Sequence, residues 1–576
     1  MPDDARGPVP TAADRAAPDC AGLDFYAADR GLRDLLAIYL PATVRGVLEP
    51  HFARLGRLAG NRLDELARIA DKHPPVLHPR DRFGRDEDWI EYHPAYREME
   101  VIAFGDFQFH AMSHRTGVLG MDAPLPPVAK YAFQYLFVQA EFGLMCPISV
   151  TDTSIHLIRK FADNDLQAYL LPRMLSGDLP SLWKGTQFIT EKAGGSDVGA
   201  IETVARRDGG AWRLFGEKWF CSHADADVAL MLARPEGGPS GTRGLALFAL
   251  PRRLRDGRRN AYRIVRLKDK LGTRSMASGE ILLEGAEVWP VGQLDAGFRQ
   301  MMEQVNLSRL SHGVRAAAKM RRCVNEALAA ARGRFAFGRA VVEFPLMRRE
   351  LMKLIVPAEQ ALSIAFATAD AMGRGAAAEL RILTGLLKLR ACRDNVAVAT
   401  GAMEARGGNG YIEDWVNPRL IRDTQVGLLW EGTSNINALD VIGRAVAKDG
   451  AHRALAMLLR TRLEQASSLP SPFLAGLREA VDRVAVAAER AAANEALARS
   501  AATALYNVAS AVLLAWEGSR PGADSRRILL ARCVLEHRLM PHDPLAPGEA
   551  AWEAPVSSAL LGDHPMTLAE AVPLLA

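Results

Sequence analysis

The spacing of apolar residues divides the chain into three kinds of segment. In the first part, apolar positions recur at intervals of three and four, as in Leu36, Tyr39 and Leu40 and again in Tyr131, Tyr135 and Leu136. This is the period of an amphipathic helix, so residues 21–183 are predicted to form a helical domain. Residues 1–20, rich in Pro, Ala and charge, are predicted to be a disordered tail. A Pro-rich interruption around 73–79 is predicted to be a loop.

The period changes after Leu182. Between residues 184 and 294, short β-type runs are separated by Gly, Asp and Pro, and they lie at 212–215, 228–232, 245–250 and 280–284. Several short strands at this spacing predict an antiparallel β-barrel or sandwich domain.

The helical period returns over residues 295–447, with candidate helices at 297–333, 344–374, 377–405 and 431–447. Four such helices with short connections predict a C-terminal four-helix bundle. A further Ala-, Leu- and Arg-rich stretch predicts a helical extension over 448–576. The expected fold class is therefore α+β, mostly α. There is no strand–GxGxxG–helix unit and no GxxxxGK[ST] loop, so a large cofactor would be held in another way.

Composition narrows the class of protein only a little. The chain has 576 residues, a formal net charge of +4 and six cysteines without a CxxC pair. These features favour reduced thiols in a cytoplasmic protein, without a zinc site. The N-terminus lacks the pattern of a signal peptide, and the apolar runs are too short to predict a membrane span. His110 and His114 have the i,i+4 spacing of zinc ligands but no evident third ligand, so we expect solvent-facing histidines and no metal.

Two motifs in the β region carry candidate chemistry. In residues 189–198 (ITEKAGGSDV), adjacent glycines allow close backbone approach to a ligand, and Thr190 and Ser196 supply hydroxyls. In residues 216–222 (GEKWFCS), Phe220 could stack on a flat ring and Ser222 could hydrogen-bond its edge. Taken separately, the first motif is more typical of a polar turn, and the second is equally typical of a core aromatic residue.

Three further motifs lie in the bundle region. Residues 334–338 (RFAFG) place Arg334 beside aromatic residues, and arginine suits a pyrophosphate. Residues 404–411 (EARGGNGY) form a Gly-rich turn. Residues 430–435 (WEGTSN) place Glu431 between a Trp and a Gly, where an apolar wall would tune a carboxylate for acid or base work. The alternative for Glu431 is a helix N-terminal residue stabilised by the macrodipole.

Taken together and in this order, the motifs resemble the acyl-CoA dehydrogenase family over roughly residues 90–447, and within it the AidB-like branch. The resemblance implies FAD bound between the β domain and the bundle. It implies that Ile189 and Thr190 line the flavin ring, with Phe220 stacked on it and Ser222 at its edge. The same resemblance adds further cofactor-binding residues: Ser196, Cys221, Arg334, Phe337, Glu404, Gly407, Gly408, Trp430, Thr433 and Asn435.

The resemblance also implies a reaction, the α,β-dehydrogenation of an acyl-CoA, with Glu431 as the catalytic base. Ser196 and Arg309 would lie near the CoA part of the substrate. Arg334 would reach the flavin of a neighbouring subunit, which implies a homotetramer, and an electron-transferring flavoprotein would be the electron acceptor. Three departures from the family pattern bear on CoA and flavin binding: Lys192 with Ala193, Ala336, and Glu404 in place of a common Gln.

The extension leaves a second hypothesis open. Arg526, Arg527, Arg532 and Arg538 recur at near-helical spacing in a mildly basic segment. By resemblance to the AidB-like branch, the C-terminal domain could bind double-stranded DNA through phosphate contacts, with weak or vestigial dehydrogenase activity. The alternative is a solvated helical face or an assembly surface.

Overall fold

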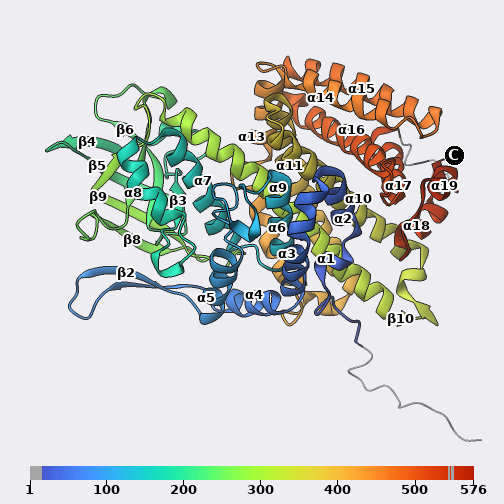
Figure 1. Cartoon of the computed structure of the whole chain (residues 1–576), viewed down its shortest axis with the longest axis horizontal. Helices are drawn as coiled ribbons and strands as arrows, with labels where there is room; N and C mark the ends of the chain where they lie inside the picture. The colour runs from blue at the N-terminus through green and yellow to red at the C-terminus, as the bar shows by residue number, and fades with distance from the viewer. Residues whose placement is uncertain (1–15, 542–544, 546–550, 576) are drawn as a thin grey trace, which may run out of the picture.

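The computed structural model describes residues 16–541, 545 and 551–575. A β domain lies at one side, helices fill the centre, and the C-terminal extension covers the other side (Figure 1). The N-terminal domain carries these elements: α1 (Phe25–Ala28), α2 (Arg30–Tyr39), α3 (Ala42–Gly60), α4 (Arg62–Lys72), β1 (Val76–Arg80), β2 (Asp86–Glu91), α5 (Pro94–Glu100), α6 (Pro127–Ala140), α7 (Met145–Phe161) and α8 (Asn164–Met174).

Three expectations for this domain are wrong. The Pro-rich segment expected to be a loop includes the antiparallel β1–β2 hairpin, which reaches the β domain, where Ile264 N donates to Asp88 Oδ2 at 2.8 Å. Residues 16–20, expected in a disordered tail, pack on the bundle, and the Cys20 thiol donates to Glu326 at 2.8 Å; the rest of that predicted tail lies outside the described residues. His110 and His114 are buried in turns rather than solvent-facing, because their ring nitrogens bond Ser176 O and Asp152.

The β domain contains β3 (Gly185–Phe188), β4 (Val204–Asp208), β5 (Ala211–Ser222), β6 (Val228–Pro235), β7 (Ala246–Pro251), β8 (Tyr262–Leu267) and β9 (Ser278–Pro290). The pairings β6–β4, β4–β5, β5–β9, β9–β7 and β7–β6 form a closed ring, with β3 and β8 attached to it. Closure leaves few free strand edges, as in a barrel. Most pairings are antiparallel as expected, but β3–β6 and β4–β6 are parallel.

The bundle is built on three long helices, α9 (Gly297–Gly333), α10 (Pro345–Gly373) and α11 (Ala377–Arg406). The hairpin strands β10 (Phe335–Ala336) and β11 (Arg339–Ala340) follow α9. The short helix α12 (Asn417–Gln425) was not anticipated. The fourth expected helix begins as α13 (Ser434–Leu439) and continues as the π-helical segment η10 (Asp440–Val446). Glu431 therefore lies in the turn before this helix, not within it, and has a φ of 53°.

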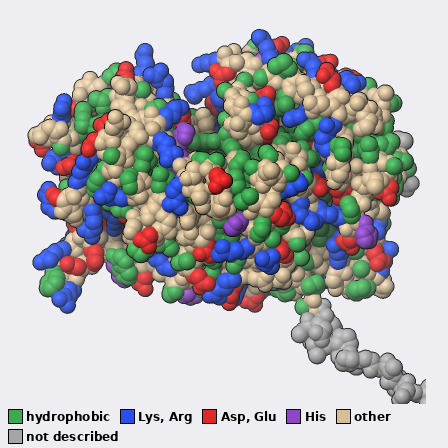
Figure 2. All heavy atoms as spheres, in the orientation of Figure 1, with side chains coloured by type: hydrophobic (Ala, Val, Ile, Leu, Met, Phe, Trp, Pro, Cys, Tyr) green, Lys and Arg blue, Asp and Glu red, His purple; other side chains and the backbone are tan. Residues whose placement is uncertain are grey.

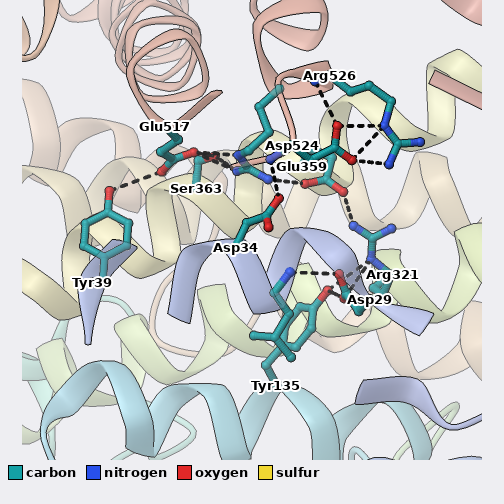
Figure 3. Close-up of polar contacts among 12 residues, drawn as sticks. Asp29, Asp34, Tyr39, Tyr135, Arg321, Glu359, Ser363, Glu517, Asp524 and Arg526 are labelled. Atoms are coloured by element: carbon teal, nitrogen blue, oxygen red, sulfur yellow. Dashed lines mark hydrogen bonds and ion pairs between the residues drawn. The ribbon is translucent and has the colours of Figure 1, made fainter. Parts of the chain in front are cut away.

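The extension contains α14 (Ala451–Gln465), α15 (Ser471–Ala492), α16 (Ala498–Gly518), α17 (Arg526–Val534), α18 (Glu553–Leu561) and α19 (Leu568–Ala571). A buried ionic network joins it to the other domains (Figure 3). Arg527 pairs with Glu359 at 2.9 Å and with Glu517 at 2.7 Å, and Glu359 also pairs with Arg321. Arg321 in turn contacts Asp29 of the N-terminal domain at 3.1 Å.

The hypothesis that these arginines form an exposed basic face of the extension is wrong. Arg526, Arg527 and Arg532 are at most 9% exposed. Arg526 pairs with Asp524, and Arg532 donates to the Leu574 carbonyl and lies over the Trp552 ring. Arg538 is half-buried and faces Asp394 at 3.9 Å. Arg527 and Arg538 thus face carboxylates of the bundle, and Arg526 and Arg532 are paired within the extension, so these four side chains do not form an exposed surface for phosphates.

Two helices in the described part of the chain are long and apolar enough, by length and composition, to cross a membrane. They are Pro345–Gly373 and Glu495–Gly518, so the expectation that the apolar runs are too short was wrong on length. In their most apolar windows 89% and 72% of the residues are buried inside the protein, as in the core helices of a bundle.

On the face shown in Figure 2, acidic and basic side chains are interspersed.

Candidate functional site

Glu431 is held as a buried carboxylate against one face of α9. The Ser308 hydroxyl donates to Oε1 at 2.7 Å. His312, one turn further along α9, places Nε2 3.0 Å from Oε2. That approach lies off the direction of a hydrogen bond, so Oε2 has no hydrogen-bond partner among the described residues. One carboxylate oxygen is thus anchored, and the other is free to accept a proton.

The electrostatic surroundings keep Glu431 ionised. Burial alone would raise the pKa of its carboxyl, but His312, Lys388 and the Ser308 hydroxyl outweigh burial and hold the pKa at about 2. Burial lowers the pKa of His312 to about 4 despite the neighbouring carboxylate. At neutral pH the pair is therefore a carboxylate beside a neutral imidazole.

Arg309 has a different place from the one expected. It is 5% exposed, pairs with Asp440 at 2.8 Å, and its Nε donates to the Glu431 carbonyl at 3.2 Å. A positive φ is unfavourable for Glu431, and this contact stabilises the strained turn. Arg309 therefore positions the backbone of Glu431, and its guanidinium is not free to bind the CoA part of a substrate.

The surroundings of Glu431 come from three domains. Cys146 of α7, Val150 and Met276 form a small apolar cluster on which Trp430 packs, and the Trp430 ring meets His312 edge-on at 5.4 Å. Burial raises the pKa of the Cys146 thiol, and Arg315, Glu431, Lys270 and Ser222 all lie near enough to act on it. Ser222 of the β domain and Glu431 of the bundle thus face a common site.

The strand of the β domain that carries Ser222 also presents an exposed aromatic ring, that of Phe220. Phe220 is 57% exposed and Ser222 is half-buried, whereas Cys221 between them is fully buried. Trp219 N donates to the Thr190 carbonyl at 2.9 Å, which fixes the segment of half-buried Ile189 and Thr190 next to this strand. The prediction of Cys221 as a cofactor contact is therefore wrong for its side chain, which faces the core of the β domain.

The Gly-rich loop after Thr190 is held by a buried ion pair. Glu191 pairs with Lys218 and accepts from the Thr203 hydroxyl at 2.5 Å, and Glu191 N donates to the Gly194 carbonyl at 2.9 Å. Ser196 follows on the exposed side of this loop. The loop is thus preorganised, with its hydroxyl available to a ligand.

A second group of predicted residues lies far from Glu431 in the same chain. Arg334 and Phe337 follow α9, and Phe337 is 95% exposed. Arg334 lies against the turn at Gly407, where an added Cβ would come within 2.9 Å of its Nη1. Glu404 and Gly408 are exposed beside it. From His312 to Arg334, α9 rises about 33 Å, so this group does not reach the Glu431 site of its own chain.

The comparisons with known proteins agree with this arrangement. Residues 16–179 match the model of the adaptive response protein AidB N-terminal domain, residues 186–286 the acyl-CoA dehydrogenase middle domain, and residues 295–447 the acyl-CoA dehydrogenase C-terminal domain. A relative in Escherichia coli (strain K12), "Putative acyl-CoA dehydrogenase AidB", is 35% identical over 395 residues, which are 66% of this chain and 70% of that protein. The chain belongs to the acyl-CoA dehydrogenase family.

A further relative and two solved structures are also similar to this chain, and the match that covers 97% of the chain includes the extension. "Acyl-CoA dehydrogenase family member 11" of Caenorhabditis elegans is 32% identical over 438 residues, which are 72% of this chain and 69% of that protein. The crystal structure of Caenorhabditis elegans ACDH-11 in complex with C11-CoA covers 97% of this chain and 98% of its own, with a TM-score of 0.83 and 26% identity. The structure titled "Bd2924 apo-form" covers 87% of this chain and 99% of its own, with a TM-score of 0.77 and 30% identity.

Members of the acyl-CoA dehydrogenase family are FAD flavoproteins, and FAD is the cofactor that this membership assigns. The described residues fit it. Phe220 offers an exposed ring, Ser222 a hydroxyl and Thr190 a polar edge at the junction of β domain and bundle. The described residues contain no group of three or more His, Cys, Asp or Glu that could hold a metal ion.

Sequence reasoning missed several residues of this candidate site. His312 contacts Glu431, Asp440 anchors Arg309, and Arg315 and Cys146 lie beside them. Positions 308, 312 and 315 share one helix face. Their spacing along the sequence could therefore have indicated that His312 and Arg315 lie on the same side of α9 as Ser308. Thr433 and Asn435 are exposed at the start of α13, and Arg499 of the extension approaches Asn435 at 3.5 Å.

Proposed function

We propose that this protein is an FAD-dependent acyl-CoA dehydrogenase in which Glu431 removes the α proton of an acyl thioester. The observation that carries the proposal is the Glu431 carboxylate itself, which is buried and ionised, anchored through Oε1 and free at Oε2. A base of this kind needs a fixed direction and an available lone pair. The name of the neighbour solved with C11-CoA supports an acyl thioester as the substrate class.

The chain's own residues supply the proton-transfer half of the reaction. Ser308 and His312 hold the carboxylate, and Arg309 holds its backbone. A substrate packed on Trp430 would exclude water from Glu431, and loss of water raises the pKa of a carboxylate and makes it a stronger base. Bound FAD would supply the acceptor for the β hydrogen as hydride. Glu431 would take the α proton, and the single bond between the α and β carbons would become a double bond.

The test is Glu431→Gln in the FAD-loaded protein. We expect anaerobic flavin reduction by acyl-CoA thioesters to slow about 10³-fold, because general-base catalysis is lost while the shape of the site is kept. Flavin absorbance in a stopped-flow instrument measures the rate, and calorimetry measures thioester binding. Glu303→Gln is the matched control, since Glu303 pairs with Lys160 near the start of the same helix. A Glu431→Gln protein that reduced its flavin at the wild-type rate would remove Glu431 as the base.

We further propose a homotetramer in the cytoplasm that passes electrons to an electron-transferring flavoprotein. The distance along α9 between the Arg334 group and Glu431 supports assembly, because a second copy of the chain would bring Arg334 and the exposed Phe337 to the flavin. The branch-specific N-terminal match and the electron acceptor usual in the family are consistent with this proposal.

Binding of double-stranded DNA is a second candidate, supported by the match to the AidB N-terminal domain and by the Escherichia coli relative. The buried arginines of α17 are not available for it. Any phosphate contacts would use exposed arginines of the preceding helices, such as Arg453, Arg478 and Arg490. Such contacts would weaken steeply with salt in a fluorescence-anisotropy titration, and substitution of Arg453, Arg478 and Arg490 together would abolish them.

A further inference from the structure

Arg315 on α9 is a buried guanidinium without a carboxylate partner. It is 1% exposed. Its Nε and Nη2 donate to the Ser311 hydroxyl at 3.3 and 3.1 Å, and Nη2 also donates to the Met145 carbonyl at 3.3 Å. Nη1 has no hydrogen-bond partner, and no carboxylate of the described residues lies within ion-pair distance. Nε and Nη2 of the guanidinium are therefore held by hydrogen bonds, and Nη1 is free to donate to a ligand.

The next arginines of the same helix show how the protein usually buries this side chain. Arg321 pairs with Asp29 and Glu359. Arg322 pairs with Asp64 at 3.0 Å and Glu326 at 3.0 Å. Burial of a charge is costly unless it is paired, and Arg315 is the exception among these three. An unpaired buried cation held by rigid neighbours is the arrangement expected of a site that receives an anion.

Arg315 belongs to the same site as the base. It follows His312 by three positions, so it lies on the same helix face and about 4.5 Å further along the axis. Burial lowers the pKa of Arg315, and Cys146 and Glu431 lie near enough to act against this effect. Lys388, 2% exposed, also lies near Glu431 and donates to the Gly427 carbonyl at 2.6 Å without a carboxylate partner. The surroundings of the single carboxylate thus carry an excess of positive charge.

We propose that Arg315 selects acyl thioesters whose acyl chain carries a carboxylate, bound by the free Nη1 group. This inference rests on the proposed function, because it takes Glu431 as the group that faces the α carbon. Because His312 and Arg315 are less than one helical turn apart, the base and the guanidinium lie close together, and a short dicarboxylic acyl chain of about five carbons is the one to test. Arginine is suited to this role because its guanidinium stays charged and presents N–H groups in a fixed plane.

The test compares two ligands that differ only in the distal carboxylate, glutaryl-CoA and pentanoyl-CoA. Their affinities are measured by calorimetry on the FAD-loaded Glu431→Gln protein, so that no turnover is needed. We expect glutaryl-CoA to bind about 30-fold more tightly, since a buried charge-assisted hydrogen bond is gained. Arg315→Met should bring the ratio of the two affinities to about one or below, and Arg315→Lys should retain part of the preference because the charge remains.

The matched control is Arg483→Met, which removes an exposed arginine of α15 that pairs, among the described residues, only with Glu479 of its own helix. It should leave the ratio unchanged. Equal affinities for the two thioesters in the starting protein, or a preference that survives Arg315→Met in a protein with a normal melting curve, would overturn the inference. Flavin reduction in the protein with Glu431 intact is read separately. If neither thioester reduced the flavin while the affinity ratio held, the dehydrogenase proposal would fail and the carboxylate site would stand.

Discussion

Two of the buried charge clusters in the described part of the protein differ in how completely they are paired. In the network that joins the extension to the bundle, Arg527, Arg321, Glu359, Glu517 and Asp29 each contact at least one partner of opposite charge (Figure 3). Around Glu431, by contrast, Oε2 of the carboxylate and Nη1 of Arg315 have no hydrogen-bond partner among the described residues. Complete pairing of charges stabilises the fold. Buried polar atoms without a hydrogen-bond partner, held by rigid neighbours, can instead bind a ligand or take part in its reaction.

The largest effect on stability is expected from Arg527→Met. This change leaves Glu359 and Glu517 with fewer partners in a buried place, and breaking one side of a buried ion pair costs about 3–5 kcal/mol. Thermal unfolding followed by circular dichroism should show a clearly lower melting temperature. Ligand affinity of the folded fraction should be unchanged, because the network does not touch the Glu431 site.

Replacement of both charges sharpens this comparison. Arg527→Leu combined with Glu517→Leu should be less destabilising than Arg527→Met alone, since no carboxylate of that pair is left unpaired. An Arg527→Met protein that melted at the wild-type temperature would show that the network is not needed to hold the extension in place.

An intermediate effect is expected from His312→Leu, on the rate and its pH dependence. His312 is among the groups that hold the pKa of Glu431 at about 2, so its loss lets burial dominate and the pKa rises. The base is active only as a carboxylate, so flavin reduction is lost as pH falls through this pKa. We expect the acid limb of the rate profile to move to higher pH by one unit or more.

His312→Gln is the matched variant for this measurement, since it keeps a hydrogen-bond donor beside the carboxylate. It should retain most of the rate at neutral pH. If the acid limb of His312→Leu coincided with the wild-type limb, followed from pH 8 down to the lowest pH at which both proteins stay folded, the contact at 3.0 Å would not tune the base.

Much of the architecture could be predicted from the sequence. The hydrophobic period of each segment is a local pattern, and the succession of these periods gives the order of the domains. The span of α9 was predicted to the residue, and the expected strands fall in β5, β6, β7 and β9. The β1–β2 hairpin was not predicted because its prolines and charged residues interrupt the alternation of apolar and polar residues that marks a strand. Its contact with the β domain joins residues far apart in the sequence, which local patterns do not predict.

The candidate site was only partly readable for a related reason. Motifs identified Glu431 and Ser222, which both lie near Cys146. They also identified Phe220, which is exposed two residues before Ser222 on the same strand. The roles of Arg309 and Cys221 were misjudged, because burial and pairing depend on the partner elements. The same holds for the arginines of α17, whose helical spacing suggested an exposed basic face although their partners, such as Glu359 and Glu517, lie far away in the sequence.

The smallest effects are expected from a pair of serine substitutions that differ only in which cluster they touch. Ser308 donates to Glu431 at 2.7 Å, and Ser363 donates to Glu517 at 2.7 Å. A hydrogen bond to a charged group contributes about 1.5–3 kcal/mol. Ser308→Ala should therefore slow flavin reduction about tenfold with little change in melting temperature. Ser363→Ala should lower the melting temperature with little change in rate. If both variants lost stability and kept their rate, the Glu431 cluster would be structural like the network, and the distinction between paired and open charge would fail for this protein.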